Sequence, residues 1–154
     1  MSLFLKFWGT RGSIPTPGNR TKRYGGNTLC VEIRVGEHII ICDAGSGIRE
    51  LGASLMTRGI SPIVVHLLLT HSHWDHIQGF PFFVPAYVPG SQCYIYGKNE
   101  GEDRFYKLLS GQMVSDYFPV QFADLRAHVT SKFLTDGQGE IGPVKIKSCR
   151  TPIC

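Results

Sequence analysis

Three histidines and one aspartate lie within six consecutive residues of this 154-residue chain, at His71, His73, Asp75 and His76. Imidazole nitrogen and carboxylate oxygen are ligands that zinc, iron and manganese accept. A catalytic ion of this kind normally has three protein ligands and one position open to water. Four such side chains are more than one ion uses, so the spacing predicts a site for two divalent ions. A polar loop of solvated histidines is the alternative, and this density of histidines disfavours it.

The segment before the cluster, residues 62–69, is nearly continuously apolar and predicts a strand buried on both faces. The cluster then follows the carboxyl end of a strand, where ligand sites form in α/β sheets. In an extended loop, His71 and His73 point to the same side and share one ion. Asp75 and His76 are then expected to face a neighbouring ion.

The stretch His71–His76 resembles the His-x-His-x-Asp-His motif of the metallo-β-lactamase superfamily. Residues 9–15, 24–28 and 43–49 are similar to successive landmarks of one branch, which includes transfer-RNA 3′-processing ribonucleases and phosphoribosyl cyclic phosphodiesterases. The resemblance extends over residues 4–150. It implies an α/β (α+β) fold, the αββα sandwich of that superfamily, and a metal-dependent hydrolase of the phosphodiesterase type.

The resemblance also implies roles for individual residues. Asp75 is the expected catalytic residue, since a carboxylate beside the ions orients the attacking water and accepts its proton. Asp43 resembles the aspartate that braces the histidine loop through hydrogen bonds, and Asn27 lies in a comparable loop position at the rim of the site. Zinc is the first expectation for the two ions, with manganese or iron as alternatives.

The family's remaining metal ligands, two histidines and a bridging aspartate, have no counterpart here, because no histidine follows His128. We therefore expect residues 1–154 to be a single domain that is truncated at its C-terminus and corresponds to roughly the first half of the family fold. Its activity would then be impaired. If Cys149 or Cys154 replaces a missing ligand as a thiolate, the result is a closed, zinc-preferring site rather than a hydrolytic one. The alternatives are a non-catalytic metal-binding or dimerisation module and an inactive truncated product. A missing second sheet would leave an apolar face uncovered and favour a homo-oligomer.

Composition is that of a soluble globular protein, with 42% hydrophobic and 18% charged residues. The longest apolar stretch falls short of the ~20 residues of a membrane span, so no membrane is expected as a partner. Residues 1–8 predict an opening strand rather than a signal peptide. The five cysteines lack Cys-x-x-Cys spacing, which favours free thiols and a cytoplasmic location.

The formal net charge of +4 is modest, but Arg11, Arg20, Lys22 and Arg23 share one Gly- and Pro-rich loop. An anionic substrate drawn to these cations and a merely solvated loop are both open interpretations. The expected substrate is a small-molecule or nucleotide phosphodiester. Nucleic acid has weaker support, because no basic motif is interleaved with aromatic residues.

Hydrophobic periodicity predicts the elements that position the cluster. The expected strands are residues 3–8, 28–35, 38–42, 62–69, 93–96, 122–129, 132–134 and 144–149. The expected helices are residues 49–58, a short one within 77–83, and 101–112, with a turn at 136–139. Trp74 and the aromatic run at 80–83 are expected to pack beneath the metal loop.

Overall fold

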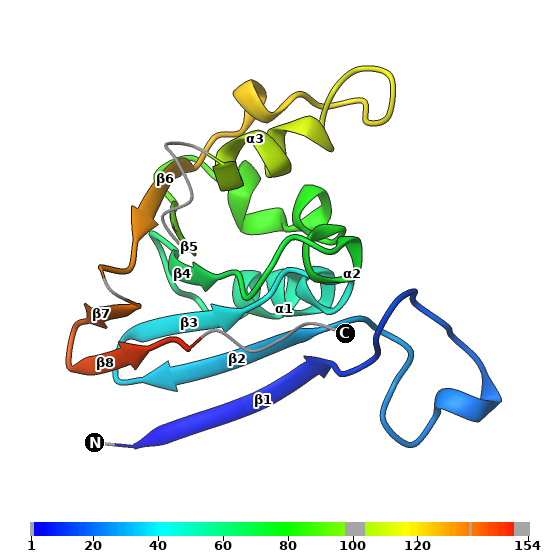
Figure 1. Cartoon of the computed structure of the whole chain (residues 1–154), viewed down its shortest axis with the longest axis horizontal. Coiled ribbons are helices and arrows are strands. Elements are labelled where there is room, and N and C mark those ends of the chain that lie inside the picture. The colour runs from blue at the N-terminus through cyan, green and yellow to red at the C-terminus, as the bar shows by residue number, and fades with distance from the viewer. Residues whose placement is uncertain (1, 98–103, 136, 150–154) are drawn as a thin grey trace.

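The computed structural model describes residues 2–97, 104–135 and 137–149. Its main feature is a six-stranded sheet in the order β1-β2-β3-β4-β5-β6 (Figure 1). The first three strands pair antiparallel, and β3 to β6 run parallel. The strands are β1 (Leu3–Gly9), β2 (Cys30–Val35), β3 (His38–Cys42), β4 (Val64–Leu68), β5 (Gln92–Gly97) and β6 (His128–Phe133).

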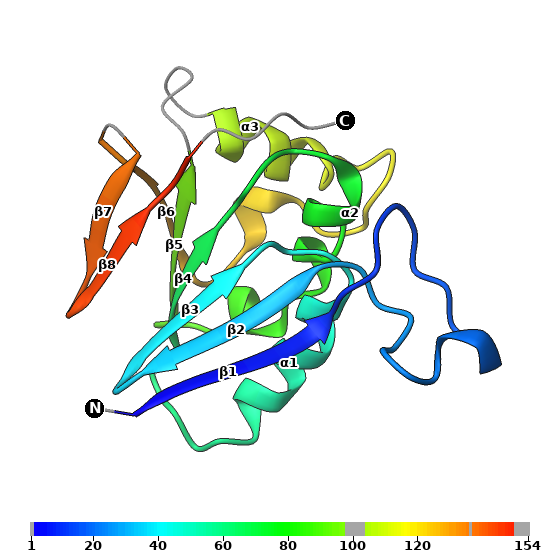
Figure 2. The ribbon, with the colours of Figure 1, turned by 60° about the horizontal axis from the view of Figure 1, so that its bottom comes forward.

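The helices cover one face of this sheet (Figure 2). They are α1 (Gly47–Met56), α2 (Trp74–Ile77) and α3 (Arg104–Gly111), with the 3-10 turns η1 (Asn19–Thr21), η2 (Phe80–Phe82), η3 (Val84–Tyr87) and η4 (Phe122–Asp124). Within the described ranges, no helix is both long enough and apolar enough to cross a membrane.

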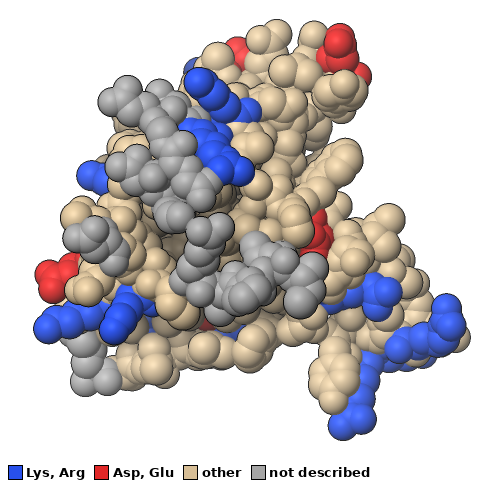
Figure 3. Space-filling view, in the orientation of Figure 1, with Lys and Arg blue, Asp and Glu red and all other residues tan. Residues whose placement is uncertain are grey.

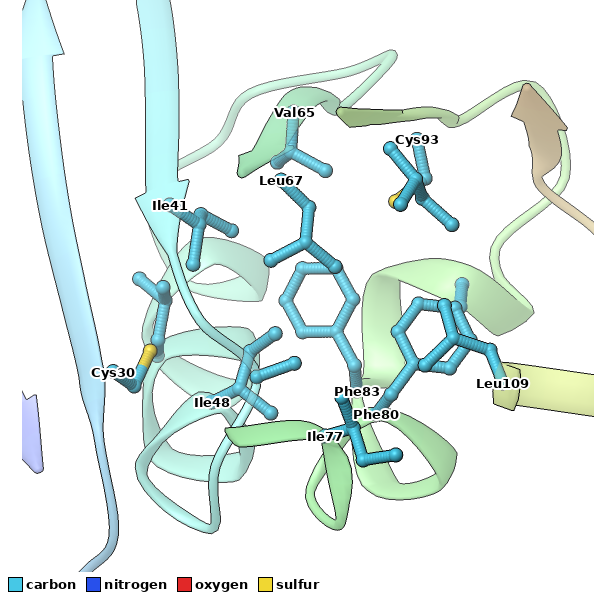
Figure 4. Packing of buried hydrophobic residues seen from close by; sticks show 14 of the residues in the cluster. Cys30, Ile41, Ile48, Val65, Leu67, Ile77, Phe80, Phe83, Cys93 and Leu109 are labelled. Carbon is cyan, nitrogen blue, oxygen red and sulfur yellow. The ribbon is translucent and has the colours of Figure 1, made fainter. Parts of the chain in front are cut away.

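The hydrophobic core lies between the helices and the sheet (Figure 4). Side chains alternate along a strand, so every second residue of β3, β4 and β5 points to the helical face. In α1, apolar residues at helical spacing turn inward against them. The buried side chains include Ile39, Ile41, Val65, Leu67, Cys93 and Ile95 from the strands and Ile48, Leu51 and Leu55 from α1. This packing fixes the carboxyl ends of β3 and β4 side by side.

The opposite face of the sheet is only partly covered. A hairpin of β7 (Gln138–Ile141) and β8 (Val144–Lys147) forms a separate two-stranded sheet, and its turn at Gly142 approaches the His38 ring. On β1, Leu3, Leu5 and Phe7 lie on the face away from α1 and stay 50–70% exposed. The expectation of an uncovered apolar face therefore holds for the described part of β1.

Most of the expected elements are confirmed within one or two residues. The chain forms the expected strands near residues 3–8, 28–35, 38–42 and 93–96, and the helix expected at 49–58 begins two residues earlier. In the last third, β8 matches the strand expected at 144–149, and α3 lies inside the stretch expected at 101–112, whose first residues lie outside the described ranges.

Three local expectations are wrong. Residues 122–129 do not form one strand: Phe122–Asp124 is a 3-10 turn with a capping box between Gln121 and Asp124, and β6 begins only at His128. Residues 128–129 and 132–133, which were expected in two separate strands, lie together in β6. The turn expected at 136–139 is present one residue earlier, because the Gln138 N–H donates to the carbonyl of Thr135 at 2.8 Å and β7 begins at Gln138; Asp136 itself lies outside the described residues. Finally, β4 was expected to be buried on both faces. Its residues that face the helices are buried, but the alternate residues on its other face are only half-buried.

Candidate metal and catalytic site

The histidine cluster lies at the edge of the sheet where β3 and β4 end. These two strands are parallel neighbours, so their carboxyl ends meet at the same edge. Asp43 follows β3 directly, and residues 69–73 lead from β4 into α2, which begins at Trp74. A short helix therefore starts inside the motif, and the motif is not one extended loop.

Asp43 links the two ends of the histidine segment. It is fully buried, and its backbone adopts a left-handed φ of 62°, which aspartate tolerates better than most residues. Its carboxylate accepts hydrogen bonds from the Thr70 backbone N–H at 2.8 Å and from the Thr70 hydroxyl at 2.9 Å. On the other side, Oδ2 of Asp43 lies 3.0 Å from Nδ1 of His76.

This contact orients the ring of His76. Its Nδ1 faces the buried carboxylate of Asp43, and its Nε2 lies 3.5 Å from Oδ2 of Asp75. The ring therefore connects the buried aspartate to the aspartate of the motif.

The three imidazoles of the motif are in mutual contact around His71. The centroid of the His71 ring is 4.0 Å from that of His76 and 4.5 Å from that of His73. Partial burial lowers the pKa of His71, and the neighbouring His76 and His73 lower it further. His71 is therefore a neutral imidazole at pH 7, the form that binds metal.

Asp75 is held from a distant part of the sequence. The backbone N–H of Ser13 donates to its Oδ2 at 2.8 Å. Partial burial acts to raise the pKa of Asp75, but the Ser13 hydrogen bond and the nearby His76 outweigh it, and the pKa lies below the usual range. The carboxylate is ionised at neutral pH and ready to accept a proton.

The backbone beneath Asp75 is tightly packed at Gly45. A Cβ atom at this position would lie 2.4 Å from the carbonyl oxygen of Asp75 and 2.5 Å from the hydroxyl of Thr28. Only glycine fits such a close approach. The Thr28 hydroxyl also accepts a hydrogen bond from the backbone N–H of Ser46 at 2.8 Å, which holds the turn after β3 against the start of β2.

The remaining side chains expected near the cluster lie elsewhere. Asn27 accepts a hydrogen bond from the Ser46 hydroxyl at 3.1 Å and has no described contact with the histidines. Trp74 is 72% and Phe82 53% exposed, so the expectation that they pack beneath the metal loop is wrong, whereas Phe80 and Phe83 are buried as expected. His66 belongs to the sheet, where its Nδ1 lies 3.0 Å from the Tyr96 hydroxyl.

Sequence reasoning missed two contacts of the cluster. Thr70 directly precedes the motif, and its hydroxyl lies between Asp43 and both His71 and His76. Ser13 lies 62 residues from Asp75 in the chain. No spacing in the sequence could have linked these two residues, because the contact depends on how β1 pairs with β2.

The donor set fits a divalent metal in its chemistry. Three imidazoles, one with its ring nitrogen oriented by a buried carboxylate, stand beside an ionised aspartate, which is the environment that zinc sites have. The arrangement is not a complete ligand shell, because no three His, Cys, Asp or Glu side chains in the described ranges are placed to hold one ion together. Cys149 is exposed and belongs to no such group, and Cys154 lies outside the described residues.

Comparison with known proteins agrees with the fold and the motif. The family model of the metallo-beta-lactamase superfamily matches residues 23–152. The chain belongs to the metallo-beta-lactamase superfamily.

Two kinds of curated relative share part of the sequence. An atrochrysone carboxyl ACP thioesterase from Pseudocercospora fijiensis is 37% identical over 107 residues, which cover 67% of this chain and 29% of that protein. A ribonuclease Z from Haloarcula marismortui is 31% identical over 81 residues, which cover 53% of this chain and 23% of that protein. The matched regions are thus less than a third of either relative.

Solved structures share the fold. The metallo-beta-lactamase fold protein YhfI from Bacillus subtilis has a TM-score of 0.64 at 17% identity, over 96% of this chain and 52% of that one. A diphosphatase from the PhnP family has a TM-score of 0.60 at 18% identity, over 94% of this chain and 55% of that one. The short form of human tRNase Z has a TM-score of 0.54 at 18% identity, over 87% of this chain and 53% of that one. The chain spans about half the length of these structures.

Proposed function

We propose that this chain carries part of the active site of a metal-dependent hydrolase that cleaves phosphodiesters. The observation that carries the proposal is the mutual contact of three imidazoles, one of which, His76, has its Nε2 3.5 Å from the ionised carboxylate of Asp75 that the Ser13 N–H holds in place. His71 and His73 would bind one ion, and Asp75 and His76 the other. Zinc suits these donors best, with manganese or iron as alternatives.

A divalent ion held there would supply the Lewis acidity that lowers the pKa of water toward neutrality and stabilises charge on the phosphate. The residues of the chain have distinct tasks beside it. The carboxylate of Asp75 accepts a proton from the attacking water. Asp43 holds the proton on Nδ1 of His76 and fixes the direction of Nε2. Asn27, through Ser46, supports the turn that carries Asp43.

Two features support a phosphodiester as the substrate. The ribonuclease Z relative shares 31% identity across the matched segment. A loop with four exposed cations also begins beside Asp75, and such a surface attracts phosphates. Nucleic acid and smaller nucleotide phosphodiesters both meet these conditions.

Thioester hydrolysis is the second candidate. It is favoured by the identity of 37% to the thioesterase from Pseudocercospora fijiensis and of 36% to a second one from Aspergillus aculeatus, each over 107 residues. The same metal and the same Asp75 would serve an acyl carbonyl, since both reactions add water to a polarised centre.

The test compares hydrolysis of bis(p-nitrophenyl) phosphate with that of an acyl thioester, each with zinc, manganese or ferrous iron. We expect the metal ions to stimulate cleavage of the phosphodiester. In Asp75→Asn the rate of this cleavage should fall at least about 100-fold, because a group that transfers a proton is lost. His73→Ala should lower bound metal, whereas His128→Ala, an exposed histidine outside the cluster, should not. Thioester cleavage alone would replace the first candidate by the second. Equal metal content in His73→Ala and wild type would refute the ligand assignment.

Two further proposals concern the setting of the protein. Cys30, Cys42, Cys93 and Cys149 are free thiols, which supports a cytoplasmic location. We also propose that the chain forms a homodimer through β1. This strand is an edge of the sheet, and Leu3, Leu5 and Phe7 form an exposed apolar row along it. A second copy presents the same row, so a two-fold contact would cover both.

A further inference from the structure

Residues 10–28, which lie in the loop between β1 and β2, hold the whole excess positive charge of the chain. It contains Arg11, Arg20, Lys22 and Arg23 and no Asp or Glu. The remaining Lys and Arg of the chain are as numerous as its 12 Asp and Glu, so the net charge of +4 is that of this loop. We call residues 10–28 the basic arm.

The basic arm projects from the body of the molecule at the edge of the sheet where the histidine cluster lies (Figures 1 and 2). Hydrogen bonds within the arm define its shape. The Thr21 hydroxyl donates to the carbonyl of Thr16 at 2.8 Å, and the Gly25 N–H donates to the carbonyl of Thr21 at 2.8 Å. At its base, the Thr16 N–H donates to the carbonyl of Gly26 at 2.9 Å. A braced loop has less conformational entropy to lose when a ligand binds.

The cations of the arm are available to a ligand. All four are exposed, and none of them forms an ion pair within the described ranges. Lys and Arg side chains gather on the projecting arm without Asp or Glu beside them on the face shown in Figure 3. Tyr24 follows Arg23, is 70% exposed, and its ring centroid lies 5.0 Å from the Arg23 guanidinium. The arm therefore offers both positive charge and an exposed aromatic ring.

The arm is joined to the candidate site. Ser13, near its start, donates its N–H to Asp75. Next to Asp75 in the chain, Trp74 is 72% exposed, which gives this edge of the sheet a second exposed aromatic ring. A ligand lying along the arm would thus arrive at the histidine cluster.

We propose that the basic arm binds single-stranded nucleic acid, with its cations on successive phosphates and Tyr24 stacked on a base, and leads the strand to the histidine cluster. This inference rests on the proposed phosphodiesterase function and names its substrate class. A small phosphodiester has a single negative charge, whereas cations spread along an arm fit a repeating phosphate backbone. An exposed aromatic ring among them fits bases, which stack on it, better than it fits an acidic polypeptide or an anionic membrane surface.

Binding is tested with a fluorescently labelled single-stranded oligonucleotide of about 12 nucleotides, a length within the usual range for such sites. Anisotropy is measured with EDTA present, so that no hydrolysis interferes. The variant Arg20→Ala/Lys22→Ala/Arg23→Ala should bind at least about tenfold more weakly, with a slope of log K against log salt that is smaller by about 2. Tyr24→Leu should weaken binding about fivefold or more without changing that slope.

The matched control removes three exposed cations elsewhere, Arg126→Ala/Lys145→Ala/Lys147→Ala, and should leave affinity within about twofold. Circular dichroism and thermal unfolding verify that each variant is folded. The proposal is overturned if the control loses as much affinity as the arm variant, or if the arm variant binds like wild type. Tighter binding of poly-glutamate or of anionic phospholipid vesicles than of the oligonucleotide would also overturn it.

The chelator separates this inference from the proposed function. Arm-dependent binding in EDTA together with no metal-stimulated hydrolysis would refute the phosphodiesterase and leave the arm as a binding surface. Hydrolysis of small phosphodiesters together with no arm-dependent binding would refute the arm as a binding surface and leave the phosphodiesterase.

Discussion

Nδ1 of His76 lies 3.0 Å from the fully buried Oδ2 of Asp43, and this contact joins the ends of β3 and α2. The same carboxylate holds Thr70 at the end of β4. One buried side chain thus fixes the start and the end of the histidine segment. Because it orients the His76 ring, it links the stability of the sheet edge to the ligand geometry of the cluster.

We predict that Asp43→Asn weakens metal binding by about 10- to 100-fold, since a side chain that orients a ligand has effects of this size. An amide accepts the Thr70 and His76 hydrogen bonds less well, and it has no charge with which to hold the Nδ1 proton. Competition with a chromogenic zinc chelator measures the change. Asp116→Asn, at an exposed position outside the cluster, is the control. Equal zinc affinity in Asp43→Asn and wild type would contradict the orienting role.

Gly45→Ala should disturb the cluster without replacing the side chain of any candidate ligand. The new Cβ would lie 2.4 Å from the carbonyl oxygen of Asp75 and 2.7 Å from the backbone nitrogen of Leu29, so backbone must move. We expect a loss of about 1–3 kcal/mol of unfolding free energy, as for overpacking in a filled core, together with weaker metal binding. Urea denaturation and the chelator assay measure the two effects.

Gly111→Ala is the matched control for this change, because nothing lies within 4 Å of a Cβ at Gly111 in α3. It should be neutral or stabilising by up to about 1 kcal/mol. If Gly45→Ala behaved in the same way, the close approach between Gly45 and Asp75 would not be a feature of the folded protein.

The residues that sequence reasoning placed correctly are those whose signals are local. Alternation of apolar residues located β2, a short apolar run located β3, and the contiguous motif brought His71, His73 and His76 together. Phe122 was assigned to a strand, but the chain buries it from a 3-10 turn, because packing in the core outweighs local preference there.

Contacts between distant segments could not be predicted in the same way. The N–H of Ser13 reaches Asp75 only after β1 pairs with β2, and a register shift between Phe7 and Gly9 precedes the arm. Trp74 faces solvent because the short helix α2 directs Ile77 inward instead. These orientations depend on tertiary packing, which no spacing in the sequence records.

The buried carboxyl of Glu32 should make stability depend on pH. Its burial acts to raise its pKa, but hydrogen bonds from Arg58 and Trp8 outweigh this, and the pKa lies below the usual value. A lowered pKa contributes stability that is complete above the unfolded-state value of about 4.3 and is lost as pH falls through the folded-state value. We expect Glu32→Gln to lose about 3–5 kcal/mol at pH 7, as when one partner of a buried pair is removed.

Urea denaturation at pH 7 and at acidic pH checks this prediction. The difference between wild type and Glu32→Gln should shrink on acidification, since glutamine does not titrate. Glu50→Gln is the matched control: Glu50 pairs with Arg49 on the surface, and both side chains are more than half exposed. That change should have an effect of at most about 1 kcal/mol. A difference at Glu32 that is independent of pH would show that its charge does not carry the stabilisation.

The exposed row on β1 leads to the last prediction. If two copies pair through Leu3, Leu5 and Phe7, wild type should have twice the mass of one chain at micromolar concentration in light scattering. Phe7→Lys places a charge within that contact and should shift the protein toward the monomer. Tyr117→Lys is the control, because Tyr117 is 80% exposed and lies outside β1. A wild-type monomer, or an equal shift in both variants, would refute association through this strand.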